Sequence, residues 1–298
     1  MNASSLQMLS GFAPELSLST FGTKNILSEL SGKQSVKSSI QANWEAYHYC
    51  LGRSTNAELS IGRYLNWLMT DLPDHFMNLV VSTGLPSEGI DDLIESALVH
   101  FRTKNVRKLS WLAHAGLPFT EMHKAMLTHG LTFRESFATK MAVNLASLPE
   151  SLPTHPDLKI VPVGDECALR QWIHVASIGF KISEKFEKVW YDFFVDAIFN
   201  PQFQTYLALL NGKPVGTSQL FLSEGVAGIY NVTCIPEARG RGIGSAITLA
   251  PLLHAREMGY RIGILQASKQ GYNIYRRLGF QDLGDLSVYL WENERYVM

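Results

Sequence analysis

The residues with the clearest chemical potential form one short stretch, ARGRGIGSA, which runs from Ala238 to Ala246 directly before an apolar helical pattern. Three glycines and two arginines lie in it: Gly240, Gly242, Gly244, Arg239 and Arg241. A helix start exposes backbone N–H groups and carries partial positive charge, so acidic residues are typical there. Glycines let the chain approach an oxygen-rich ligand closely, and the added arginines need an anion to neutralise them. The stretch therefore predicts an anion site, and phosphate is the anion that we expect.

Two nucleotide-binding motifs do not fit this stretch. The G-x-x-x-x-G-K-[ST] loop needs a lysine, and none precedes Ser245. The dinucleotide fingerprint G-x-G-x-x-G also fails, because the spacing here is G-x-G-x-G and no acidic residue follows at the right place in the next strand. What remains is the pattern Arg239-x-x-Gly242-x-Gly244.

The elements around this loop predict a mixed sheet. A strand at 227–235 precedes the loop, and a helix follows it to about Met258, with Gly259 as its stop. Further elements are a strand at 158–163, helices at 165–180 and 183–199, a hairpin turned by Asn-Gly at 211–212, a strand at 261–268, a short helix within 271–280 and a strand at 286–292. This order predicts an α/β fold with a mixed (α+β) sheet. Pro251 should also remove one helix bond, freeing the Ile247 carbonyl.

Two segments of this half resemble a known family. Residues 229–244, IYNVTCIPEARGRGIG, resemble the acyl-CoA-binding motif Q/R-x-x-G-x-G/A of the GNAT (N-acetyltransferase) superfamily. Residues 274–280, IYRRLGF, resemble the family's LYxKxGF element and lie at about the expected distance downstream. The two segments occur in the family's order with a strand–helix–strand frame, and the resemblance covers residues 157–298.

The resemblance implies a set of site residues for acetyl-CoA, and no metal. The pyrophosphate would lie on the amides of Arg239, Gly240, Arg241, Gly242, Ile243 and Gly244, with Ser245 nearby. The pantetheine arm would run along 231–235, with Cys234 and Ile235 as contacts, and the amides of this strand would polarise the thioester carbonyl. Tyr275 matches the tyrosine that protonates the departing thiolate. Ser268 stands where many members have asparagine, and could bond the pantetheine or a water. Arg276 and Arg277 could meet the 3′-phosphate or face water.

The implied reaction is direct transfer of an acetyl group to an amine of a small molecule or a protein. Glu224, Glu166 and His174 are base candidates by chemistry alone, and a water relay is an alternative. A non-catalytic acyl-CoA-binding or regulatory module remains a second hypothesis. The aromatic residues between Phe180 and Phe194 could line an acceptor pocket or belong to the core.

The first half mirrors the second. Residues 37–148 read as strand, helix, strand, helix, strand in the order found after Ala227, which predicts a degenerate GNAT-like domain. Its equivalent of the glycine loop is LPSEGIDDLIES, where Glu88, Asp91 and Asp92 would cap the helix and repel phosphate. We therefore expect one cofactor site, in a domain spanning 157–298, after an N-terminal arm at 1–36 and a linker at 149–156.

Composition limits the remaining classes. The formal net charge of the 298 residues is −1, which does not favour nucleic acid or an anionic membrane. No segment predicts a membrane span or a secretion signal, and Cys50, Cys167 and Cys234 form neither a CxxC pair nor a disulfide framework. Metal-binding spacing is absent from the sequence. We expect a cytoplasmic protein, with monomer and homodimer both open.

Overall fold

The computed structural model describes residues 26–293, apart from 31–32, 55, 74, 76, 85–87, 114–118 and 152–154. These residues divide into two compact units. Unit 1 contains residues 56–137 and 286–293, and unit 2 contains residues 26–54 and 138–285. Within the described ranges, no helix is both long and apolar enough to cross a bilayer.

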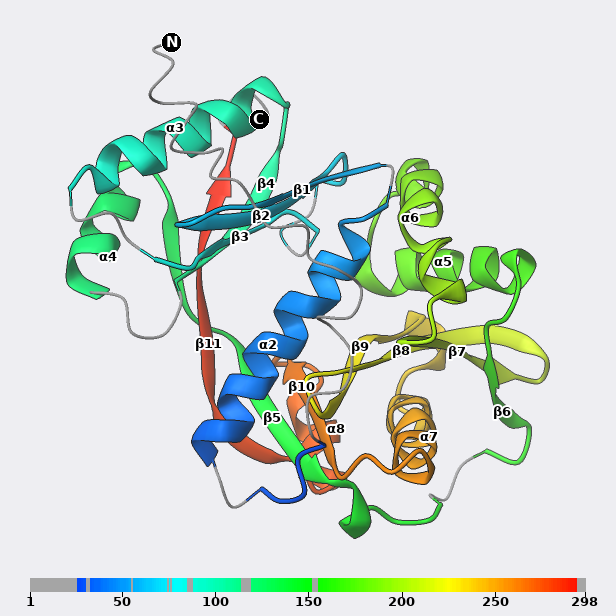
Figure 1. Cartoon of the computed structure of the whole chain (residues 1–298). Coiled ribbons are helices and arrows are strands. Elements are labelled where there is room, and N and C mark those ends of the chain that lie inside the picture. Colours follow the sequence, from blue (N-terminus) through cyan, green and yellow to red (C-terminus); the bar gives the residue numbers. More distant parts are fainter. Residues whose placement is uncertain are drawn as a thin grey trace. The chain divides into compact units, whose positions relative to one another are not determined.

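Unit 2 is built around one mixed sheet (Figure 1). Its strands are β6 (Leu158–Pro162), β7 (Phe203–Leu210), β8 (Lys213–Ser223), β9 (Val226–Cys234), β10 (Ile262–Ala267) and residues 138–144 of β5 (Thr132–Asn144). Its helices are α2 (Lys33–Leu51), α5 (Glu166–Phe180), α6 (Glu187–Phe194), α7 (Ile243–Glu257) and α8 (Tyr272–Arg277). The strand order is β5-β10-β9-β8-β7-β6, and only β9 and β10 run parallel among these neighbours.

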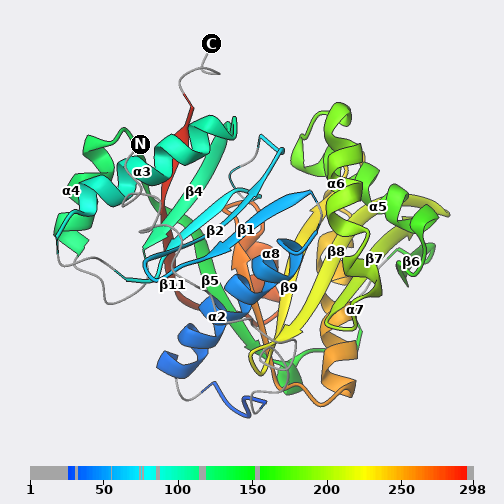
Figure 2. The same ribbon diagram turned by 45° about the horizontal axis from the view of Figure 1, so that its top comes forward.

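Helices cover both faces of this sheet. Figures 1 and 2 both show α2, α5 and α6 on one side of β7–β9 and α7 on the other. The side chains of β8 alternate accordingly: Ser218 donates to the Ile247 carbonyl of α7, and Gln219 accepts from Tyr47 of α2. The α7 face is filled by apolar residues that include Leu220, Leu252 and Phe280. Burial on both faces makes this sheet the rigid support of any site at its strand ends.

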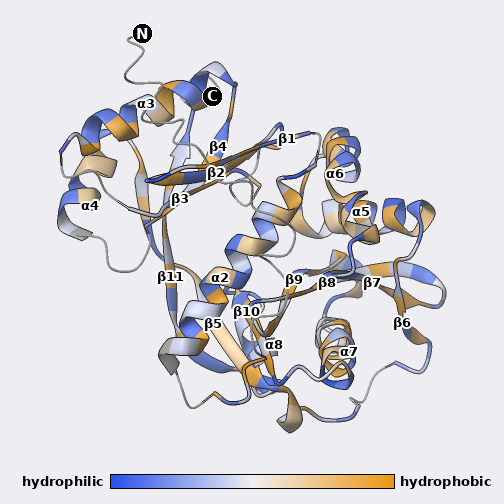
Figure 3. Cartoon of the chain, viewed as in Figure 1, coloured by the Kyte–Doolittle hydropathy of each residue, from blue (hydrophilic) through white to orange (hydrophobic). Residues whose placement is uncertain are grey.

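Unit 1 repeats the same plan with fewer strands. It contains β1 (Ala57–Ile61), β2 (Leu65–Thr70), β3 (Leu79–Ser82), α3 (Ile90–Thr103), β4 (Lys108–Ala113), α4 (Phe119–Thr128) and the end of β11 (Gln281–Glu292). The order is β1-β2-β3-β4-β11, with β3 and β4 parallel. Polar and apolar residues alternate along α3 (Figure 3), and its apolar side, including Phe101, packs with Trp111.

The two units are copies with exchanged last strands. In each copy a helix links the parallel pair (α3 between β3 and β4, α7 between β9 and β10), and a second helix leads to a final strand. The final strand of the first copy, β5, pairs with β10, and residues 289–292 of β11 pair with β4. The expected second GNAT-like copy is therefore confirmed as a fold, but each copy ends in the other's sheet.

This exchange changes the division expected from the sequence. The chain passes from one unit to the other at 54/56, 137/138 and 285/286. The sequence predicts a linker at 149–156, which lies within unit 2, and residues 152–154 of it are outside the described part. Helix α2 belongs to unit 2 although it precedes the first copy. Its buried residues Val36, Ile40, Asn43 and Tyr47 recur at helical spacing, which is the local pattern that indicates this helix. Residues 1–25 of the expected arm lie outside the described part.

Candidate active site

Strands β9 and β10 separate soon after they begin. They pair at Ala227–Gly263 and Gly228–Ile264, and among the described residues no further pair joins them, although both strands continue. Strands β8 and β5 pair with their outer edges. The inner edges beyond Gly228 and Ile264 therefore carry backbone polar groups without a strand partner. Such edges suit an extended ligand that hydrogen-bonds as a strand does.

A β-bulge lies in β9 beside this opening. Thr217 pairs with Thr233 and Gln219 with Tyr230, so β9 has one extra residue opposite Ser218. Asn231 within the bulge has φ 51°, and the Thr217 hydroxyl donates to its carbonyl at 2.8 Å. The bulge changes the direction of the amides that follow it.

The glycine-rich loop begins where β9 ends. Gly240 and Gly242 both have φ 76°, a conformation that favours glycine, and Gly242 is the N-cap of α7. No acceptor among the described residues lies within hydrogen-bond distance of the amides from Gly240 to Ser245. The Arg239 amide differs, because it already donates to the Pro236 carbonyl at 3.2 Å. Six consecutive amides at a helix start thus remain for an anion.

The two arginines of the loop have different surroundings. The Arg239 guanidinium donates to the carbonyls of Cys234 and Gly179 at 3.2 and 3.3 Å, which ties the loop to β9 and α5. Arg241 is exposed and has no hydrogen-bond or ion-pair partner in the described part of the chain. Of the two, Arg241 is therefore the cation without a protein partner. Arg276 donates to the Phe280 carbonyl at 3.3 Å, and Arg277 is exposed.

Tyr275 lies on α8 beside the end of β9. It is 8% exposed, its ring packs edge-on against Phe280, and Cys234 lies near enough to affect its ionisation. Burial, with a smaller contribution from Cys234, raises the pKa of the Tyr275 phenol well above its ordinary value. Burial also raises the pKa of the Cys234 thiol to about 11, against the effect of Arg239. Both groups are uncharged at neutral pH, so Tyr275 can donate a proton but not accept one.

Gly271 has no side chain, which makes room for the Tyr275 ring. A Cβ on Gly271 would lie 2.7 Å from Cε2 of Tyr275, which is closer than real contacts allow. Gly244 at the start of α7 faces the same helix, since a Cβ there would meet Ile274 Cδ1 at 3.4 Å. The loop, β9 and α8 are therefore brought together.

Two expected cofactor contacts have other partners. The Ile235 amide donates to the Val215 carbonyl at 3.0 Å, so it continues the β8–β9 pairing and has no free N–H for pantetheine. The Ser268 hydroxyl accepts from the Gly271 amide at 3.2 Å and stabilises the turn before α8. Both residues lie beside the opening, but these groups serve the protein backbone.

The base candidates lie apart from the opening or are paired. Glu224 lies in the turn before β9, at the opposite end of the strand from Cys234. The strand between them is roughly 26 Å long, at about 3.3 Å per residue. Glu166 accepts from the Tyr191 hydroxyl at 2.5 Å, and His174 Nδ1 lies 3.0 Å from Glu187. The aromatic residues Trp190, Phe193 and Phe194 are buried core, while Phe180 is 41% exposed.

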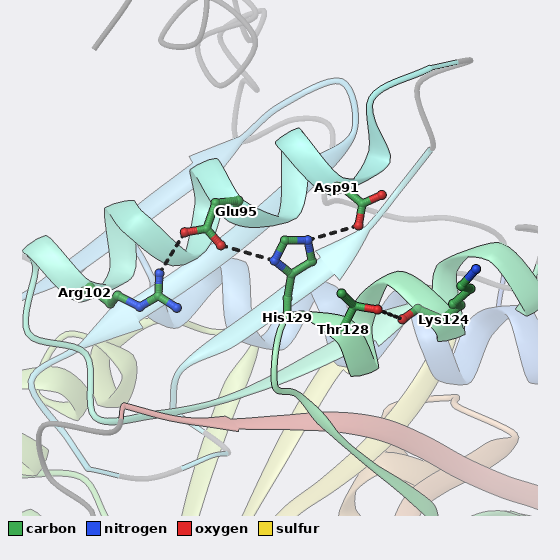
Figure 4. Close-up of polar contacts among 6 residues, drawn as sticks. All are labelled: Asp91, Glu95, Arg102, Lys124, Thr128 and His129. Carbon is green, nitrogen blue, oxygen red and sulfur yellow. Dashed lines mark hydrogen bonds and ion pairs between the residues drawn. The ribbon is translucent and has the colours of Figure 1, made fainter.

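The equivalent place in unit 1 has no opening. Strands β3 and β4 pair at all four residues of β3, from Leu79–Ser110 to Ser82–Ala113. At the start of α3 the N-cap is Gly89 and not an acidic side chain, which corrects the expected capping. Figure 4 shows how the carboxylates are used instead: His129 bonds Asp91 and Glu95 at 3.1 and 3.2 Å. Among the residues that the structure describes, β3 of unit 1 has no unpaired edge facing β4, and no basic residue lies at the start of α3.

The strand pair that opens beside the glycine-rich helix start lies within a segment that matches a known family model. Residues 201–282 match the family model described as an acetyltransferase (GNAT) domain. These residues of the C-terminal half are therefore similar to a GNAT domain. Comparison with curated protein sequences finds no match.

Solved structures extend the likeness of fold to most of the chain. A GCN5-related N-acetyltransferase from Kribbella flavida has a TM-score of 0.60 at 18% identity, covering 84% of this chain and 95% of its own. A tandem GNAT protein from the clavulanic acid biosynthesis pathway has a TM-score of 0.55 at 15% identity, covering 88% and 94%. A GCN5-related N-acetyltransferase from Sphaerobacter thermophilus has a TM-score of 0.56 at 17% identity, covering 79% of this chain and 82% of its own. The shared feature is the fold, including its tandem form.

Proposed function

We propose that this protein is an acetyl-CoA-dependent N-acetyltransferase with one acyl site, in unit 2, and that its acceptor is an amine of a small molecule or a peptide. The observation that carries the proposal is the separation of β9 from β10 beside six amides with no protein acceptor. The unpaired edges suit the amides of pantetheine, and the loop with Arg241 suits a diphosphate.

Each residue of the site has a distinct task in this reaction. Acetyl-CoA would supply an activated acetyl group. The amine nitrogen bonds to the carbonyl carbon, the carbon–sulfur bond breaks, and the sulfur leaves as a thiolate. The proton that the amine loses passes to water, through which Tyr275 regains the proton that it gives to the sulfur. The amides of Gly240 to Ser245 hold the diphosphate, and those of the β9 bulge donate to the carbonyl as negative charge develops. Tyr275, kept protonated by burial, donates its proton to the departing sulfur. The buried Cys234 thiol adds no charge there.

Thermal unfolding with ligands tests the cofactor. Acetyl-CoA at 100 times its Kd should stabilise the protein by about 2.7 kcal/mol and raise Tm by several degrees, whereas ATP and NAD should not. Gly244→Ala should lose this shift. A Cβ there meets Ile274 Cδ1 at 3.4 Å, an ordinary contact, so the fold should tolerate it. In the proposed complex the diphosphate approaches the amides around Gly244 too closely to leave room for a Cβ. Gly164→Ala is the matched control, since a Cβ there meets nothing within 4 Å. An equal shift in both variants would remove the proposed loop site.

Thiol release from acetyl-CoA, measured against amines, amino acids and peptides, tests catalysis. Stimulation by an acceptor supports the enzyme. The alternative, a non-catalytic acyl-CoA-binding module, is favoured by the remote or paired base candidates. A ligand-induced Tm shift without thiol release under any acceptor would decide for that module.

A further inference from the structure

A buried network of uncharged polar side chains joins α2 to β8 and β9. The Tyr47 hydroxyl donates to Gln219 Oε1 at 2.9 Å and accepts from Asn231 Nδ2 at 2.7 Å. Asn231 Nδ2 also donates to Gln219 Oε1 at 3.2 Å. Tyr47 and Gln219 are 2% and 1% exposed, so these bonds are shielded from water. The bulge residue Asn231 is thereby fixed to a helix that lies far away in the sequence.

A second branch of the network reaches β10. The Tyr230 ring stacks on Tyr47 with centroids 4.0 Å apart and planes 11° from parallel. The Tyr230 hydroxyl donates to Asn43 Oδ1 at 2.7 Å, and Asn43 Nδ2 donates to the Ser223 carbonyl at 2.9 Å. Gln266 of β10 lies near enough to Tyr230 to lower its pKa slightly against the larger effect of burial. Helix α2 therefore holds a β9 side chain that lies near β10 where the two strands separate.

Gly228 shows how closely α2 approaches this point. A Cβ on Gly228 would lie 2.3 Å from Asn43 Oδ1, so only glycine fits there. Gly228 is also the last residue of β9 that pairs with β10. The helix thus lies over the place where the opening begins.

The bulge depends on being held. Asn231 has φ 51°, in the left-handed region, which asparagine adopts more readily than other residues with a Cβ, especially when its side chain is hydrogen-bonded. The Asn231 side chain bonds Tyr47 and Gln219, and its carbonyl bonds Thr217. Removing the Tyr47 hydroxyl would leave Asn231 with a single side-chain partner and free the bulge to relax.

We propose that Tyr47 is a positioning residue of the acyl site, which acts through Asn231 to aim the bulge amides of β9 at the thioester carbonyl. The inference rests on the proposed function. It assigns a part of the site to α2, which lies outside the residues 201–282 that match the family. The network is uncharged, because burial raises the pKa of the phenols of Tyr47 and Tyr230. Its effect is geometric and should not change between about pH 6 and 9, well below the ordinary phenol pKa of about 10.

The test measures the binding of acetyl-CoA and of CoA by calorimetry. One amide hydrogen bond to the acetyl carbonyl should make acetyl-CoA bind about threefold to tenfold more tightly than CoA to the natural protein. Tyr47→Phe keeps the stacked ring and removes the hydroxyl, so this ratio should fall towards one while the Kd of CoA changes less than about twofold. Asn231→Gly suits φ 51° but lacks Nδ2, and should lower the ratio in the same way.

Tyr206→Phe is the matched control. Tyr206 is also a buried phenol of unit 2, bonded to His254 Nδ1 at 2.8 Å, but it lies on the α7 face. Both variants should lower Tm, yet only Tyr47→Phe should lose the ratio and reduce kcat by about tenfold to 100-fold. An unchanged ratio in Tyr47→Phe would overturn the inference alone. Failure of the natural protein to bind either ligand would overturn it together with the proposed function.

Discussion

Ser268 and Gly271, near Tyr275, form one turn. The Ser268 carbonyl and hydroxyl both accept from the Gly271 amide, at 3.0 and 3.2 Å. This turn places Gly271 against the Tyr275 ring, where a Cβ would lie 2.7 Å from Cε2. The turn thus helps to hold the aromatic ring near Cys234 at the end of β9.

Tyr275→Phe tests the acid role at this scale. The ring keeps its packing, so the Kd of acetyl-CoA should stay the same while kcat falls about 10²-fold, as expected for loss of a general acid. Because burial raises the phenol pKa, Tyr275 stays protonated, and kcat should not decline between about pH 7 and 9 on its account. Steady-state kinetics across this range provide the measurement, and unchanged turnover in the variant would exclude proton donation by Tyr275.

Helix α7 continues through a proline because another element replaces the missing bond. Pro251 has no N–H, so the Ile247 carbonyl loses its helical partner, as the sequence predicts. The Ser218 hydroxyl of β8 donates to this carbonyl at 2.7 Å. A buried strand residue therefore supports the helix whose start forms the loop.

A double-mutant cycle tests this support. Ser218→Ala should cost about 1–3 kcal/mol of unfolding free energy, because it leaves a buried carbonyl unsatisfied. In a Pro251→Ala background the new N–H can reach Ile247, so the same change should cost at least about 1 kcal/mol less. Urea unfolding of the four proteins measures the difference. Additive effects would mean that the Ser218 bond does not replace the helical one.

At the scale of the whole molecule, unit 2 is not a continuous segment of the chain. Its core includes Val36 and Ile40 of α2, Met141 and Val143 of β5, and Leu145 just after it. At roughly 1.5–3 kcal/mol each, these side chains contribute about 10 kcal/mol. That loss is as large as the total stability of a typical domain, about 5–15 kcal/mol.

The fragment 157–298 should therefore fail to fold, although it contains the whole motif. We expect no cooperative thermal transition, strong binding of a hydrophobic dye and no Tm shift with acetyl-CoA, compared with the full chain. Circular dichroism and dye fluorescence are the measurements. A fragment that melted cooperatively and responded to acetyl-CoA would contradict the dependence on α2 and β5.

The turns, the helix stop and the glycine-rich loop of this protein could be predicted from its sequence, because each depends on local backbone conformation. The Asn-Gly turn at 211–212, the stop at Gly259 and the glycine loop each follow from backbone conformations that few residues adopt, and the structure has positive φ at all of them. The mirrored order of the two halves likewise follows from hydrophobic periodicity, which is a local signal.

The sequence alone could not decide which strand pairs with which copy, or which helix covers the opening. Residues 139–144 of β5 pair with β10 of the other copy, and no pattern within β5 specifies that partner. Tyr47 and Asn231 are 184 positions apart, so their bond exists only after α2 packs on β9. Ile235 was expected to contact the ligand, but its amide donates to the Val215 carbonyl once β8 pairs with β9. The Ser268 hydroxyl accepts from the Gly271 amide and keeps its own proton to donate, so its contact with a ligand stays a prediction. Residue types determined what chemistry is possible here, and long-range packing determined which groups remain free to do it.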